Sequence, residues 1–76
     1  MVGTVKKIKL SPNQVKDFVS AATKCDFDVD VANNRFTVDA KSILGVFGLD
    51  FTRPLTVSFY GYNKDFESYL DEHAVA

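Results

Sequence analysis

The sequence predicts an α+β protein: an open-faced sandwich in which four antiparallel strands carry three helices on one face. Three segments, residues 4–10, 27–38 and 55–60, alternate apolar and polar residues as strands with one wet face do. Segments with helical spacing follow, each after a capping residue. The resulting order is β-α-β-β-α-β-α. A chain of 76 residues has room for one domain with a modest core, so we expect residues 1–76 to form a single domain.

A strong helix-start signal separates the first strand from the first helix. Residues 4–10 (TVKKIKL) are rich in β-branched residues and alternate lysines with aliphatic side chains. Ser11 then fits an N-cap, Pro12 the first helical position and Gln14 the returning side chain of a capping box. We expect the helix to end near Lys24. Its buried stripe is formed by Val15, Phe18, Val19 and Ala22.

Residues 27–38 predict a β-hairpin. In its first half, aspartates alternate with apolar residues, and Asn33-Asn34 offers a two-residue turn because Asn tolerates positive φ. That turn sets Val31 opposite Phe36. We expect five apolar side chains of the hairpin to be buried together: Phe27, Val29, Val31, Phe36 and Val38.

The second half of the chain completes the pattern. Residues 42–49 predict a short helix, and residues 55–60 a fourth strand with Leu55, Val57 and Phe59 on its inner face. Asn63 is the expected cap of a last helix. One side of that helix carries Phe66, Tyr69, Leu70 and His73.

The segment VDAKSILGVFGL, residues 38–49, carries a family resemblance. It resembles the regulatory-serine segment of the histidine-containing phosphocarrier protein (HPr) of the bacterial sugar phosphotransferase system. The matching residues are Val38, Lys41, Ser42, Ile43, Leu44, Gly45, Val46, Phe47 and Leu49. HPr proteins share the predicted order of elements, and the resemblance covers nearly the whole chain. It therefore implies an HPr-like fold.

The residue that would carry the family's chemistry is missing. HPr proteins hold a phosphoryl group on a histidine that caps the first helix, within a His-Ala-Arg-Pro signature. The matching positions here are Ser11, Pro12, Asn13 and Gln14, so the histidine, the arginine and the following proline are all absent. A serine hydroxyl forms a far more inert ester than an imidazole does. We expect histidine phosphoryl transfer to be lost and the protein not to be an enzyme.

The resemblance makes Ser42 the main candidate site. In the family this serine is phosphorylated by a dedicated HPr kinase in some bacteria, and the modified protein then binds a transcriptional regulator of carbon-source genes. Leu44 and Phe47 match the apolar patch that the family presents to its partners, and Lys41 adds a neighbouring charge. Each of these residues also has a purely structural interpretation, as a helix cap or a core side chain.

Three function classes stay open at this point. The first is an HPr-like regulatory domain that binds protein partners and is switched at Ser42. The second is an unusual phosphocarrier that uses Ser11 or His73, the only histidine. The third is an unrelated role on the same fold, because a fold alone does not fix function.

Composition excludes several other classes. A net charge of −1 gives no overall attraction to nucleic acid or to anionic membranes, and the longest apolar stretch is far too short to span a bilayer. Cys25 is the single cysteine, so a reducing cytoplasm is the expected location. The aspartates at 26, 28 and 30 lack the glycine and glutamate of a calcium loop. We expect no metal, no cofactor and no small-molecule substrate.

Overall fold

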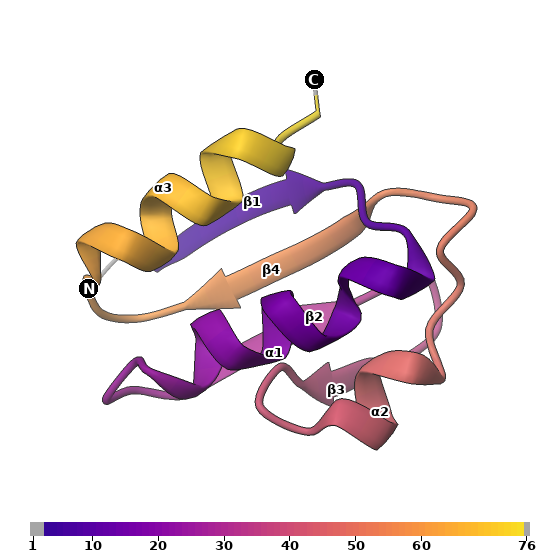
Figure 1. The fold of residues 1–76 in the computed structure, drawn as a ribbon, viewed down its shortest axis with the longest axis horizontal. Coiled ribbons are helices and arrows are strands. Elements are labelled where there is room, and N and C mark those ends of the chain that lie inside the picture. Colours follow the sequence, from indigo (N-terminus) through magenta and orange to yellow (C-terminus); the bar gives the residue numbers. More distant parts are fainter. Residues whose placement is uncertain (1–2, 76) are drawn as a thin grey trace.

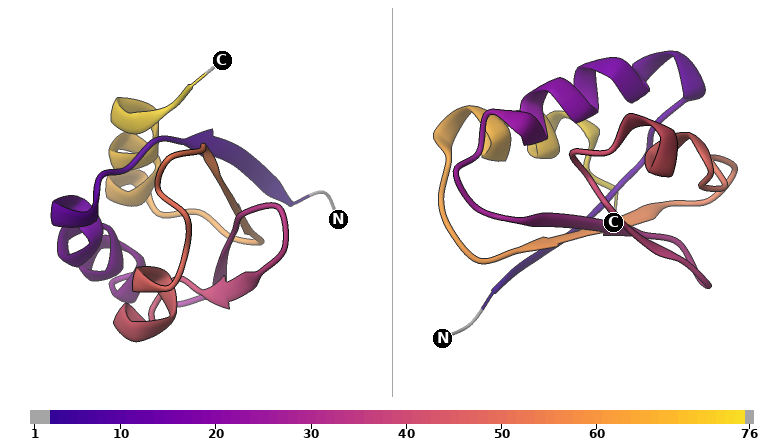
Figure 2. Two further views of the ribbon diagram at one scale, coloured as in Figure 1. Left: turned by 90° about the vertical axis from the view of Figure 1, so that its right-hand side faces the viewer. Right: turned by 90° about the horizontal axis from the view of Figure 1, so that it is seen from below.

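The computed structural model describes residues 3–75 and shows a four-stranded antiparallel sheet with all three α-helices on one face (Figures 1 and 2). The strands lie in the order β1-β4-β2-β3. The elements are β1 (Thr4–Ile8), a 3₁₀ turn η1 (Pro12–Gln14), α1 (Val15–Thr23), β2 (Val29–Ala32), β3 (Thr37–Asp39), α2 (Ile43–Phe47), β4 (Leu55–Phe59) and α3 (Lys64–His73). The predicted α+β open-faced sandwich is confirmed.

Alternation along the strands decides which face the helices cover. On β4, Leu55, Val57 and Phe59 are buried while the residues between them lie on the outer face. The same period places Lys7 of β1 and Asp30 of β2 outward and exposed. The helices complete the core with the buried side chains Val15, Phe18, Ala22, Val46, Phe66 and Leu70. Burial of these apolar groups is the main stabilising contribution.

The three helix starts lie where the sequence predicts them. The side-chain oxygen of Gln14 accepts a hydrogen bond from the Ser11 N–H at 2.9 Å, the returning arm of a capping box. The Asn63 side chain accepts from the Phe66 N–H at 2.9 Å. Ser42 caps α2 in the same way, at 3.3 Å from the Gly45 nitrogen. Each cap satisfies a backbone donor that the helix cannot pair internally.

The predicted hairpin exists, but its register is wrong by two residues. Val31 pairs with Val38, not with Phe36, and Asn33 donates its N–H to the Phe36 carbonyl. The Asn33 side chain also accepts from the backbone N–H groups of Arg35 and Phe36, which centres the turn one residue later than predicted. A shift of two keeps Val38 on the inner face. Phe36, expected in the core, is instead 60% exposed.

The C-terminal end of the described chain covers part of the β1 edge. The Lys9 N–H donates to the His73 carbonyl at 2.9 Å, and the Val75 N–H donates to the Lys7 carbonyl at 3.0 Å. These bonds occupy backbone groups that an edge strand otherwise leaves free. They also fix the end of β1, and with it the start of the segment that leads to α1.

Candidate functional site

Helix α2 is held on the core by one buried side chain and one glycine. Val46 is fully buried, whereas the side chains around it turn outward. A Cβ on Gly45 would lie 3.3 Å from the Ser42 hydroxyl and 3.4 Å from the Val38 Cβ. The absence of a side chain at Gly45 thus lets this short helix approach β3 closely, with Ser42 at its exposed start.

Three apolar side chains of α2 face outward. Leu44 is 83% exposed, Phe47 is 47% exposed and Ile43 is 38% exposed. We call these three residues the α2 patch. A patch of this kind on one short helix is a typical feature of surfaces that bind other proteins.

Ser42 begins this helix with its side chain at the surface. Its extended backbone lets the hydroxyl oxygen accept from the Gly45 N–H, and its own N–H donates to the Asp39 carbonyl at 2.9 Å. The hydroxyl proton has no acceptor within residues 3–75. Ser42 is therefore an exposed cap whose side chain lies at the protein surface.

Lys41, expected to offer a free charge, is tied to the protein. Its Nζ donates to the Cys25 carbonyl at 2.9 Å, and its backbone N–H donates to the Asp39 carboxylate at 2.9 Å. The side chain bridges the loop after α1 to the start of α2. A partner that binds Lys41 would have to share or break this contact.

Ser11 occupies the position that the resemblance matches to the HPr histidine. Its hydroxyl donates to the Asn13 side chain, an amide that cannot take up a proton. Gln14 is used in the cap. No group near Ser11 among these contacts could serve as the base that activates a serine nucleophile.

His73 is part of an aromatic stack on α3. Its ring lies on that of Tyr69, with centroids 4.4 Å apart, and Nδ1 lies 2.9 Å from the Tyr69 carbonyl oxygen. The residue is half-buried. Because one ring nitrogen is bound and one face is covered, these contacts give His73 a structural role.

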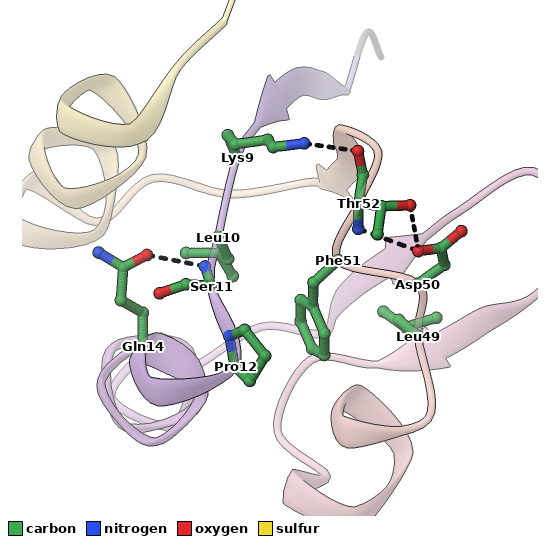
Figure 3. A pocket seen from close by; sticks show the side chains of 9 residues that line it. All are labelled: Lys9, Leu10, Ser11, Pro12, Gln14, Leu49, Asp50, Phe51 and Thr52. Carbon is green, nitrogen blue, oxygen red and sulfur yellow. Dashed lines mark hydrogen bonds between the residues drawn. The ribbon is translucent and has the colours of Figure 1, made fainter.

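An open cleft of about 590 Å³ lies between the β1–α1 connection and the loop that leads from α2 to β4 (Figure 3). It brings Ser11 next to residues that directly follow α2. The cleft residues are Lys9, Leu10, Ser11, Pro12, Gln14, Leu49, Asp50, Phe51 and Thr52. Residues 50–52 carry no sequence motif of a functional site. Their only local signal is an aspartate two residues before a threonine, which is typical of turns.

The described part of the chain contains neither a membrane-spanning helix nor a cluster of metal-binding side chains. No helix among residues 3–75 has the length and apolar character needed to cross a membrane. No group of three or more histidine, cysteine, aspartate or glutamate side chains in that range is arranged to hold a metal ion.

Comparison with known proteins supports the fold. No protein-family model matches this chain, and no curated protein sequence matches it. Among solved structures, HPr-C-His from Thermoanaerobacter tengcongensis is similar, with a TM-score of 0.67 and 22% sequence identity over 95% of this chain and 93% of that one. The likeness extends across the whole domain and shows an HPr-like fold. At this identity it shows the fold alone.

Proposed function

We propose that this chain is an HPr-like regulatory domain that has lost histidine phosphoryl transfer and acts by binding proteins through the α2 patch. The observation that carries the proposal is the exposure of Leu44 and Phe47 beside the exposed cap Ser42. When a partner covers large exposed apolar side chains, their surface leaves water, which favours binding. The whole chain would act as one domain in the cytoplasm.

Lost phosphoryl transfer is supported by the surroundings of Ser11. Its hydroxyl bonds to an amide oxygen, and the arginine that could neutralise a phosphate is replaced by Asn13. A phosphoserine would also be too stable an ester to pass its phosphoryl group on readily. Binding without group transfer therefore suits these residues better than a carrier role.

Phosphorylation of Ser42 is the proposed switch. The oxygen accepts only from the Gly45 N–H, so a phosphate can be attached there without breaking a buried contact. It would add roughly −1.5 to −2 charge at neutral pH next to the apolar patch. A partner with an apolar pocket beside an arginine or lysine would then bind the modified form more tightly. The expected partners are an HPr kinase and a carbon-catabolite transcriptional regulator.

The test uses purified HPr kinase and purified regulator. Incubation with the kinase and ATP should place one acid-stable phosphate on Ser42, located by mass spectrometry, and none on Ser42→Ala. Calorimetry should then show that the regulator binds the phosphorylated domain at least about tenfold more tightly than the unmodified one. Ser42→Asp should keep the domain folded, which a thermal melt checks.

Matched variants locate the binding surface. Leu44→Ala should weaken regulator binding by about tenfold, as loss of an interface anchor does. Val5→Ala removes a similarly exposed apolar side chain from β1, far from α2 along the chain, and should leave affinity unchanged. Equal losses from both variants, or no modification of Ser42, would contradict the proposal.

A further inference from the structure

The cleft shown in Figure 3 has apolar walls and a basic group at one end. Pro12, at the start of η1, lies across from Phe51, which comes from the loop after α2. Leu10 and Leu49 also line the cleft, and both are buried members of the core. The opening is therefore a slot with a ring on each side and aliphatic residues in its lining, which suits a flat apolar ligand.

Lys9 supplies the polar end of the slot. Its side chain reaches across to the loop, where Nζ donates to the Thr52 carbonyl at 2.7 Å. That bond uses one of three ammonium protons, and within residues 3–75 Lys9 forms no ion pair. The ammonium can thus donate to an anionic group of a ligand while it keeps its bond to the loop.

The acidic residue of the cleft does not cancel this charge. Asp50 has its Oδ1 bonded to both the N–H (2.9 Å) and the hydroxyl (2.6 Å) of Thr52. These bonds, helped by the charges of Arg53 and Lys9, lower the pKa of Asp50 below its usual value. The carboxylate is used to hold the turn, and the nearby residues Lys9, Asp50 and Arg53 sum to one positive charge.

The slot is also organised before any ligand arrives. Its loop wall is fastened by the Asp50–Thr52 turn on one side and by Lys9 on the other. Its other wall is the capped start of the first helix, fixed by the Gln14–Ser11 bond. A site built from fixed segments loses little conformational entropy on binding.

We propose that this cleft binds a small aromatic monocarboxylate, with the ring between Pro12 and Phe51 and the carboxylate on the Lys9 ammonium. The volume of about 590 Å³ is within the range of small-molecule sites. A ring between two flat side chains uses the stacking that aromatic groups favour. The site is separate from the α2 patch, so it does not depend on the regulatory role proposed above.

The test is an NMR titration of the isotope-labelled protein with three probes of one shape: phenylacetate, 2-phenylethanol and phenethylamine. Phenylacetate should bind with a dissociation constant near about 1 mM, as expected for a fragment of this size. Its amide shifts should centre on residues 9–14 and 49–52. The alcohol should bind several-fold more weakly, and the amine should bind least.

Two pairs of variants assign the contacts. Lys9→Gln should weaken phenylacetate binding by about three- to tenfold and leave the alcohol unchanged, whereas Lys7→Gln, an equal change of charge two residues earlier, should leave both unchanged. Phe51→Ala should weaken all binding by about tenfold, and Phe36→Ala, which removes an exposed ring outside the cleft, should not. If Phe51→Ala fails to fold, the lysine pair still decides.

Three outcomes would overturn the site. The first is no shift at residues 9–14 and 49–52 with about 20 mM phenylacetate, which is far above the expected dissociation constant. The second is equal affinity for the acid and the amine. The third is a set of shifts that centres on α2 instead, which would assign the probe to the α2 patch and leave the cleft unused.

Discussion

The Nζ of Lys41 lies 2.9 Å from the backbone carbonyl oxygen of Cys25, sixteen residues earlier in the chain. The contact joins the loop that ends α1 to the residue before the Ser42 cap. Cys25 is buried and Lys41 is half-buried, so water has little access to this carbonyl and cannot readily replace the lysine as its hydrogen-bond donor. The lysine that sequence analysis assigned to partner binding therefore helps to position the helix that carries the patch.

Replacing Lys41 by methionine should lower the free energy of unfolding by about 1 kcal/mol. The change removes a charge-assisted hydrogen bond but keeps most of the aliphatic stem. Urea unfolding followed by circular dichroism measures the effect. Lys24 is an exposed lysine next to Cys25 in the sequence. Lys24→Met should therefore leave the free energy of unfolding within about 0.5 kcal/mol of the parent value. Equal values for the two variants would show that the Cys25 contact contributes nothing.

The exposure of α2 makes a second prediction about stability. Leu44→Ala should change the free energy of unfolding by less than about 0.5 kcal/mol, and Phe47→Ala by less than about 1.5 kcal/mol, because water already reaches both side chains. Val46→Ala, on the buried side, should cost roughly 2 kcal/mol. Thermal melts of the three variants check this order. A loss of about 3–5 kcal/mol for Phe47→Ala would instead make it a core residue.

The contacts of Ser11 lead to a prediction about phosphoryl transfer. Incubation with phosphoenolpyruvate and the general phosphotransferase enzyme should give neither an acid-labile phosphate nor an acid-stable serine phosphate, since the Ser11 hydroxyl bonds to the Asn13 amide oxygen, which cannot take up its proton. Ser11→His should recover little, because Asn13 supplies no positive charge. Radiolabelled phosphoenolpyruvate with acid and base treatment measures the label. A stoichiometric phosphate on the parent protein would refute the prediction: an acid-labile label that His73→Ala removes would identify the histidine, and an acid-stable label that Ser11→Ala removes would identify the serine.

Helix starts were predictable because each depends on a few neighbouring residues. In each cap, the two bonded groups belong to residues three positions apart: Ser11 and Gln14, Ser42 and Gly45, and Asn63 and Phe66. Strand faces were predictable for the same reason, since alternation is a local pattern. The exposure of Leu44 and Phe47 followed from the family resemblance and not from a local pattern, because an apolar side chain on a short helix can turn inward or outward.

The hairpin register was predicted wrongly because of one side chain. Asn33 binds two backbone N–H groups beyond itself and so moves the turn to Asn34-Arg35, an arrangement that the pair Asn33-Asn34 does not reveal.

The cleft could not be predicted from the sequence for another reason. Its walls, around Pro12 and Phe51, lie far apart in sequence and meet only when the sheet has formed.

Cys25 and Tyr69 predict a loss of stability in mild alkali. Burial raises the pKa of the Cys25 thiol, more than the nearby Lys41 lowers it. Burial, with the Asp17 and Glu72 carboxylates, raises the pKa of Tyr69 to about 12. The folded state thus keeps protons that the unfolded state releases above the ordinary thiol and phenol values of about 9 and 10. The free energy of unfolding should be level below those values and fall as pH rises through them.

Urea midpoints between pH 7 and pH 10 measure this slope. The window stays below the ordinary lysine value, because the Asp71 carboxylate also raises the pKa of Lys6 and would add its own loss at higher pH. Cys25→Ala combined with Tyr69→Phe should flatten the profile. The second change has a further effect: the Tyr69 hydroxyl is buried with no hydrogen-bond partner in residues 3–75, so its removal should not destabilise the domain. A parent profile that is already flat would contradict the prediction.

Gly61, which follows β4, should tolerate no side chain. Its φ of 144° is one that residues with a Cβ rarely adopt, and a Cβ there would lie 2.4 Å from the Phe27 ring. Gly61→Ala should therefore lower the free energy of unfolding by about 2–4 kcal/mol, from backbone strain together with overpacking. A double-mutant cycle with Phe27→Ala separates the two causes. If the ring clash dominates, the second change should restore part of the loss, whereas simple additivity would leave backbone strain as the whole cause.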